Sequence, residues 1–271
     1  MIKLWQCIAT RWFGIGLILS GVLITLSGCH DRSENTASTP SVPTPTEEKP
    51  APVVRIGASA THLPPYFIHQ ENGIEVDIIR EAFQKTGYDP QFDFIRERKE
   101  KFYAPNSKLD CISTVTKKAK QPGFYSDEVI SYHDVVIYLA DKGFHINRIE
   151  DLADKSIETF SDAKKHLGIA DVVKNNPLYH ERSGKASQIV LFFRRRVDVL
   201  IMDRYFFRHF RKRVAPLVDI KQKVIINDSL FSKRPYRILC KNEKVRNDFN
   251  RGLATLRAKG RYAEIVKQYI E

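Results

Sequence analysis

Three lysines, Lys117, Lys118 and Lys120, lie within four positions of the segment "TVTKKAKQPGFYSD". They follow an apolar run at residues 109–115, which is typical of a strand. Lysine side chains at the end of a strand could hold the negative charge of a ligand through their ammonium groups. The same side chains would also suit a solvated basic turn. The segment by itself leaves both interpretations open.

A carboxylate, Asp203, directly follows a second apolar run, "VDVLIM", at residues 197–202. A near-continuous apolar run predicts a strand that is covered on both faces. Because ligands of α/β proteins bind beyond the carboxyl ends of strands, Asp203 is placed to pair with a cationic group of a ligand. An aspartate here could instead cap the next helix. Its placement favours the ligand role.

Residues that could carry out bond chemistry form no recognisable pattern. His62, His69 and His133 are isolated, and no Ser-His-Asp, zinc or haem spacing is present. General acid–base catalysis would need a paired acid and base in one cleft. The sequence therefore favours a binding protein over an enzyme, and we expect neither a metal nor a cofactor.

The chain is strongly basic, with 44 Lys and Arg against 32 Asp and Glu and a formal net charge of +12. Such a balance can indicate a nucleic-acid partner, but no nucleic-acid-binding motif is present. The basic runs at residues 194–196 and 207–213 suit solvated faces, or a surface that faces anionic lipid. We therefore expect no nucleic-acid partner, although an acidic protein partner stays open.

The N-terminus has the pattern of an export signal. Residues 12–26 carry no charge but are fewer than the roughly 20 that a permanent membrane-spanning helix needs. The following "LSGC" resembles the lipobox of bacterial lipoproteins, which implies a signal peptide at residues 1–28 and a lipidated Cys29. An uncleaved membrane anchor is the alternative. Residues 29–52 are rich in Ser, Thr and Pro and predict an extended, disordered tether.

The predicted export signal limits which cysteines can pair with each other. Cys7 would leave with the signal and Cys29 would carry lipid, so Cys111 and Cys240 remain. An even pair outside the cytoplasm favours a disulfide between them. Two buried free thiols are the alternative, because cysteine is among the most often buried residues.

Strand-like and helix-like segments alternate from residue 53 to residue 271. Helical spacing recurs at residues 76–83 and in two segments near the C-terminus, which Gly260 separates. This alternation predicts an α/β fold. The expected strands lie at residues 53–59, 92–95, 109–115, 134–140, 156–160 and 197–202.

Six phrases, in one order, give the chain a specific resemblance. They are "VRIGASATHLPPYF", "NGIEVDIIREAFQKTG", "TKKAKQPGFYSDEVISYHDVVIYLADKG", "RIEDLADKSI", "ASQIVLFFRRRVDVLIMDR" and "GLATLRAKGRYAEIVKQYI". In this order, behind a lipobox, they resemble the family 3 bacterial extracellular solute-binding proteins, the amino-acid-type receptors of ABC importers. The resemblance implies a type II-like periplasmic-binding-protein fold with two crossing hinge strands. Lobe 1 would hold residues 53–138 and 236–271, and lobe 2 residues 139–235.

The resemblance also implies ligand contacts in lobe 1. Lys118 stands where relatives carry an arginine that grips the α-carboxylate of an amino acid, and Thr116 could add a hydroxyl. Lysine supplies charge but not two parallel hydrogen bonds. Tyr66 follows Pro64-Pro65 near a position where relatives place an aromatic platform, here Leu63, and Tyr66 itself would more readily fill the core.

In lobe 2, relatives present an aspartate at the position of Asp203 to the α-ammonium group. Their glycine-plus-hydroxyl turn corresponds here to Ser161 and Asp162, without the glycine. Backbone amides of this turn could bind a carboxylate, although the charge of Asp162 would oppose that unless it points away. The departures from the family pattern keep ligands other than a standard amino acid open.

The resemblance implies a lipid-anchored receptor that captures a small polar solute between two lobes and delivers it to an ABC transporter permease. It implies an extracytoplasmic location on the periplasmic side of a bacterial membrane, and we expect a monomer. A ligand sensor or partner-presenting protein that does not feed a transporter is the alternative. A lyase or dehydratase on the same scaffold is less favoured.

Overall fold

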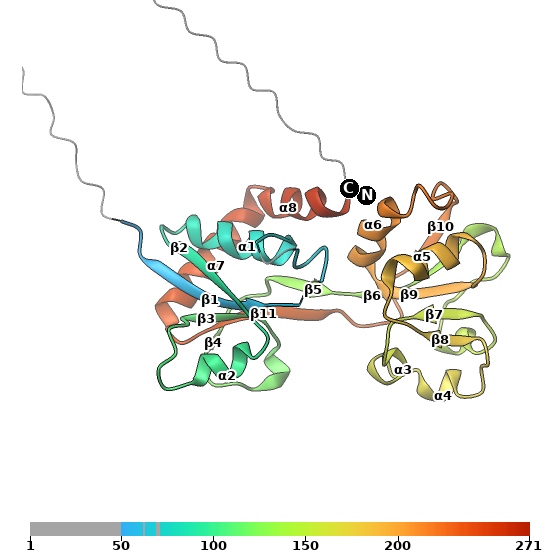
Figure 1. The fold of residues 1–271 in the computed structure, drawn as a ribbon, viewed down its shortest axis with the longest axis horizontal. Helices are drawn as coiled ribbons and strands as arrows, with labels where there is room; N and C mark the ends of the chain where they lie inside the picture. The colour runs from blue at the N-terminus through green and yellow to red at the C-terminus, as the bar shows by residue number, and fades with distance from the viewer. Residues whose placement is uncertain (1–49, 62, 69–70) are drawn as a thin grey trace, which may run out of the picture. The chain divides into compact units, whose positions relative to one another are not determined.

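A computed structural model of the chain describes residues 50–61, 63–68 and 71–271. The predicted signal peptide, Cys29 and residues 29–49 of the predicted tether lie outside the described residues, as do His62 and His69. Two mixed sheets with helices packed on their faces make up the described part (Figure 1). This arrangement confirms the α/β prediction.

The first sheet has the strand order β2-β1-β3-β11-β4, and β5 also pairs with β11. β1 is parallel to β2 and β3, whereas β11 is antiparallel to β3, β4 and β5. Its strands are β1 (Val53–Ser59), β2 (Asp89–Ile95), β3 (Cys111–Val115), β4 (Phe124–Tyr125), β5 (Ile130–Tyr132) and β11 (Arg234–Cys240).

Helices cover both faces of the first sheet. Residues of α1, α7 and α8 share one buried cluster with Ile56 of β1 and Ile238 of β11. Phe102 of α2 belongs to another cluster with Ile112 and Leu239, which point the opposite way because side chains alternate along a strand. The helices are α1 (Ile74–Gln84), α2 (Arg98–Tyr103), α7 (Glu243–Ala258) and α8 (Arg261–Ile270).

The second sheet has the strand order β10-β6-β9-β7-β8. β7 is parallel to β8 and β9, and β6 is antiparallel to β9 and β10. Its strands are β6 (Asp134–Leu139), β7 (Ile157–Thr159), β8 (Tyr179–Glu181), β9 (Val199–Asp203) and β10 (Val224–Asn227). Its helices are α3 (Ala163–His166), α4 (Ala170–Val173), α5 (Lys185–Phe193) and α6 (Arg204–Arg213).

Strand β9 is buried on both faces, as its apolar run predicts. Leu200 and Met202 pack into the cluster that includes α5 and α6 residues, while Val199 and Ile201 pack into the opposite cluster with the α4 residue Val173. All five β9 residues are buried. Full burial of each of the four apolar side chains is worth about 1.5–3 kcal/mol, so β9 is fixed at the centre of its sheet.

Two stretches of chain cross between the sheets (Figure 1). β5 pairs in the first sheet and β6 in the second, so the first crossing lies at His133. β11 carries the chain back, starting at Arg234. The division predicted after residue 138 therefore falls at the end of β6, which pairs wholly within the second sheet. The strand-like pattern continues from β5 into β6 with only His133 between them, so the sequence gives no clear sign of where one sheet ends.

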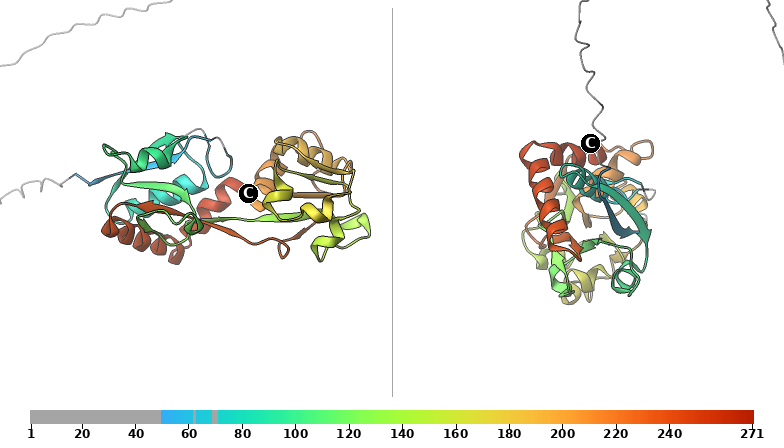
Figure 2. Two further views of the ribbon diagram at one scale, coloured as in Figure 1. Left: turned by 90° about the horizontal axis from the view of Figure 1, so that it is seen from below. Right: turned by 90° about the vertical axis from the view of Figure 1, so that its left-hand side faces the viewer.

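The lobes also meet at α6 and α8, where α8 ends beside α6 (Figure 1, Figure 2). His209 Nδ1 of α6 lies 2.8 Å from the carbonyl oxygen of Tyr269 in α8. Phe206, at the start of α6, packs against the core cluster of the first sheet. This contact fixes the C-terminal helix against the second lobe.

Cys111 and Cys240 form a disulfide, as predicted from the cysteine count. They are direct partners in the antiparallel pairing of β3 with β11, and their Cα atoms are 4.0 Å apart. Both strands belong to the first sheet. The bond therefore ties the second crossing strand to lobe 1 and does not link the two lobes.

Candidate functional site

A cavity of about 630 Å³ opens beside the second crossing strand. Lobe 1 contributes residues 116–118, which include the start of the short 3₁₀ helix Lys117–Ala119. Lobe 2 contributes His166, Leu167 and residues 230–231, and residues 232–237 complete the wall. The cavity thus takes its lining from both lobes and from the segment that joins them. Of the predicted ligand residues, it brings together Thr116 and Lys118.

The lining carries an excess of positive charge. Among the described residues of the lining, the cations are Lys117, Lys118, Lys233, Arg234 and Arg237, whereas Asp134 alone carries a carboxylate. Among the described residues, none of the three lysine ammonium groups forms a hydrogen bond or an ion pair. These charges are therefore available to a ligand.

The two arginines are held in place by neighbours. Arg234 Nη2 donates to Asp134 Oδ2 at 2.8 Å, and Arg237 Nη1 donates to the carbonyl oxygen of Ser126 at 2.8 Å. Arg237 Nε is buried and has no acceptor within the described residues. At His166, burial lowers the pKa, and the positive charge of Arg234 lowers it further. The wall of the cavity is consequently both basic and partly ordered.

Tyr66 and Asp203 lie outside this lining and are joined to each other. Tyr66 is fully buried, its hydroxyl donates to Asp203 Oδ1 at 2.8 Å, and its ring stacks on Tyr132 with centroids 3.8 Å apart. Gly73 permits this arrangement, because its φ is 131° and an added Cβ would lie 2.3 Å from the Tyr66 carbonyl oxygen. The buried pair connects the Pro64-Pro65 loop of lobe 1 with the N-terminus of α6.

The carboxylate of Asp203 accepts four hydrogen bonds. Besides Tyr66, the donors are the backbone amides of His133 at 2.7 Å, Tyr205 at 2.8 Å and Phe206 at 3.1 Å. Burial raises its pKa to about 6, although these bonds oppose the rise. Asp203 is thus the N-cap of α6, the alternative that the sequence left open. A contact with a ligand stays a prediction and would require exchange of one of these donors.

Ser161 and Asp162 are exposed at the start of α3 and do not line the cavity. The backbone amides of Asp162 and Lys164 donate to the carboxylate of Glu181, at 2.8 and 2.9 Å. The turn therefore binds a carboxylate, but one from the chain itself. The contribution of Ser161 and Asp162 to ligand binding stays a prediction.

Glu75 is a buried acid that sequence reasoning missed. Its side chain accepts hydrogen bonds from Thr114 Oγ1 at 2.8 Å and from the Tyr132 hydroxyl at 3.4 Å. Burial raises its pKa to about 7, and the bond from Thr114 and the charge of Arg98 oppose the rise. The sequence does carry a signal for this burial. Glu75 lies three and four residues, or about one helical turn, before Ile78 and Ile79, which places it on the apolar face of α1.

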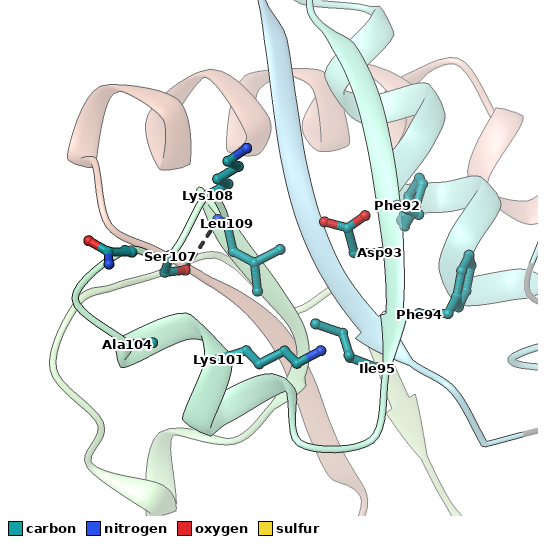
Figure 3. Close-up of a pocket in the computed structure, with 10 residues that line it drawn as sticks. Phe92, Asp93, Phe94, Ile95, Lys101, Ala104, Ser107, Lys108 and Leu109 are labelled. Carbon is teal, nitrogen blue, oxygen red and sulfur yellow. Dashed lines mark hydrogen bonds between the residues drawn. The ribbon is translucent and has the colours of Figure 1, made fainter.

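A second cavity, of about 670 Å³, lies wholly within lobe 1 (Figure 3). Asp93 and Ile95 of β2 point toward the loop that carries Ser107 and Leu109, while Phe92 and Phe94 point the other way. No predicted ligand residue lines it, and its lining comes from one sheet and its flanking helix and loop. It is the weaker candidate because lobe movement would not enclose it.

Neither metal binding nor membrane spanning has support in the part of the chain that the structure describes. Within residues 50–61, 63–68 and 71–271, no group of three His, Cys, Asp or Glu side chains is arranged to hold a metal ion. No helix in those residues is long and apolar enough to cross a bilayer.

The sequence matches the model of the bacterial extracellular solute-binding proteins, family 3, over residues 54–271. The chain belongs to this family. A comparison with curated proteins found no match.

Solved structures share the fold of this family 3 protein. A polar amino acid ABC uptake transporter substrate-binding protein from Streptococcus thermophilus is 17% identical, with a TM-score of 0.64 over 80% of this chain and 86% of that chain. An ancestral cationic amino acid solute-binding protein is 17% identical, with a TM-score of 0.61 over 81% and 96%. Substrate-binding domain 2 of Lactococcus lactis GlnP, in an open conformation, is 19% identical, with a TM-score of 0.59 over 83% and 97%.

These comparisons confirm the two-lobe fold and the family predicted from the six phrases. Family 3 and the similar structures are binding proteins rather than enzymes. At these identities the structures establish the fold of the chain, and its ligand has to be inferred from its own residues.

Proposed function

We propose that this family 3 protein is a lipid-anchored, extracytoplasmic receptor that captures a small polar solute and delivers it to an ABC importer. The observation that carries the proposal is the cavity beside β11, because its lining comes from both lobes and from the segment between them. Movement of the lobes about the crossings at His133 and Arg234 would change the volume of this cavity. Binding and closure would then be one event.

Capture needs no bond chemistry. Thr116 would offer a hydroxyl and Lys118 a positive charge from the lobe 1 side, while His166 and Ser232 face the same cavity from the other segments. Closure would remove water from these groups and strengthen their charge interactions with the solute. The solute would be a small polar molecule, and the family places amino acids and related compounds among the classes to be tested.

The disulfide suits a hinged receptor. Because Cys111 and Cys240 both lie in the first sheet, their bond stiffens lobe 1 without restraining the other lobe. The hydrogen bond from Tyr66 to Asp203 does link the lobes, because Tyr66 belongs to lobe 1 and Asp203 caps the N-terminus of α6 in lobe 2. That contact would keep one end of the interface fixed while the cavity side closes.

The lipid anchor can be tested by itself. Cells that express the full-length chain would be labelled with a palmitate analogue, with Cys29→Ser as the variant and Cys7→Ser as the matched control. Label on the wild type and on Cys7→Ser, but not on Cys29→Ser, is the expected result. Equal labelling of all three proteins would contradict anchoring at Cys29.

Capture can be tested by thermal unfolding of the full-length chain with L-amino acids, small di-acids, polyamines and muropeptides. A solute that binds only the folded state at 100 times its Kd stabilises that state by about 2.7 kcal/mol. The same solute should lower the radius of gyration in small-angle X-ray scattering, because the lobes close. If no class raises the melting temperature, the receptor proposal fails.

A further inference from the structure

We propose that the captured solute is a compact anion with at least two negative charges and no ammonium group, such as a small polycarboxylate or a phosphate compound. The inference rests on the proposed function and names the ligand class of the same cavity. It concerns the basic wall, defined as Lys117, Lys118, Lys233 and Arg237.

The charge of this wall exceeds what the composition of the chain explains. The whole sequence has 44 basic against 32 acidic residues, whereas the cavity lining has five basic residues against one acidic residue. That acidic residue, Asp134, already binds Arg234. The other four cations therefore face the cavity without a compensating carboxylate in its lining.

The three lysines of the basic wall are exposed and can still bind a ligand. Within the described residues, Lys117, Lys118 and Lys233 make no hydrogen bond or ion pair, and Arg237 has a buried Nε without an acceptor. The three lysine ammonium groups line one cavity with Arg237, so an anionic oxygen in this cavity would be stabilised by their charges.

An ammonium group, in contrast, would find no free carboxylate among the described residues that line the cavity. Asp203 accepts four hydrogen bonds from the chain and lies outside the cavity lining. Glu181 is bound to the amides at the start of α3. Asp134 is paired with Arg234. A zwitterion would bring a positive charge to a wall that already repels it.

The same charges couple the anion to closure. Lys117, Lys118 and the β11 residue Arg237 belong to lobe 1, while Lys233 comes from the segment between the lobes. Bringing like charges together is unfavourable, and more so as water leaves. A dianion removes this repulsion, so the closed state is favoured only with an anion bound.

Isothermal titration calorimetry on the full-length chain tests the proposal. One arm uses succinate and citrate, another uses inorganic phosphate and glycerol 3-phosphate, and a third uses L-glutamine and L-arginine. We expect binding in the first or second arm, which also separates carboxylate from phosphate ligands. We expect none in the third arm, and affinity that falls as salt rises.

Lys118→Glu is the test variant and Lys120→Glu is its matched control. Both lysines are exposed and in one segment, but only Lys118 lines the cavity. Reversing a charge next to a dianion should weaken binding by at least about tenfold for Lys118→Glu, and by less than about twofold for Lys120→Glu. Equal weakening by both variants would show diffuse attraction to a basic protein and would overturn the proposal.

The two proposals fail in different ways. If L-glutamine or L-arginine binds and the anions do not, the anion inference is wrong while solute capture stands. If no probe of any arm binds, the anion inference is wrong. In that case the thermal-unfolding screen decides separately whether solute capture also fails.

Discussion

Replacing Glu75 by glutamine should make the protein more stable at alkaline pH. Glu75 is fully buried, and burial raises its pKa from 4.5 to about 7. A pKa difference of 1 between the folded and unfolded chains corresponds to 1.36 kcal/mol. Ionising Glu75 in the folded chain therefore costs about 3 kcal/mol more than in the unfolded chain.

The direction in which folding stability changes with pH follows from which state holds the Glu75 proton. Between pH 4.5 and 7 the folded state holds the Glu75 proton and the unfolded state does not. The contribution of this group to folding stability is therefore fully present below pH 4.5 and is lost as the pH rises through about 7. Glutamine has no charge to bury and can still accept hydrogen bonds from Thr114 and Tyr132.

Urea unfolding of wild type and Glu75→Gln from pH 4 to pH 8 measures the effect. The stability of the variant relative to wild type should rise by about 3 kcal/mol over this range. Glu100→Gln is the control, because Glu100 is exposed and the difference should stay constant. A constant difference for Glu75→Gln as well would refute the reasoning, since it would mean that folding does not change the proton affinity of Glu75.

Two further changes test the packing of lobe 1. Replacing both Cys111 and Cys240 by serine opens a loop with a sequence separation of 129, and loop entropy predicts a loss of about 5 kcal/mol in the free energy of unfolding. A urea midpoint equal to that of the oxidised wild type would contradict this. Gly252→Ala would place a Cβ 1.9 Å from the Ala82 carbonyl oxygen, so α7 must move away from α1. Overpacking should cost about 1–3 kcal/mol in chemical unfolding, beyond the gain of about 1 kcal/mol from helix propensity, and unchanged or higher stability would show that the helices separate freely.

Local patterns were enough to predict most of the fold. The strand at residues 53–59 coincides with β1, and residues 199–202 of the apolar run that ends at Met202 lie in β9, which is buried on both faces. These patterns work because side-chain periodicity and burial are set by neighbours a few residues apart. The pairing of Cys111 with Cys240 also followed, because these two cysteines remained once Cys7 was assigned to the predicted signal peptide and Cys29 to the predicted lipid anchor.

The site depended on contacts between distant segments. The sequence placed Asp203 after a strand, but only the structure gave it four donors, one of them from Tyr66, 137 residues away. The sequence also suggested free backbone amides near Asp162, but in the structure these amides donate to the carboxylate of Glu181. Side chains that compete for one donor or acceptor cannot be ranked until their positions in space are known.

The sequence by itself determined the family, the α/β class and the lysine-rich segment after β3, because these rest on local order and composition. Only the tertiary structure decided which lysines face a common cavity. It selected Lys117 and Lys118 and left Lys120 outside, and it added Lys233 and Arg237 from β11 and the segment before it. The physical reason is that the charge of a binding site depends on which side chains lie close together in space. Here that depends on how the crossing strand β11 returns the chain to the first sheet, which no local sequence pattern encodes.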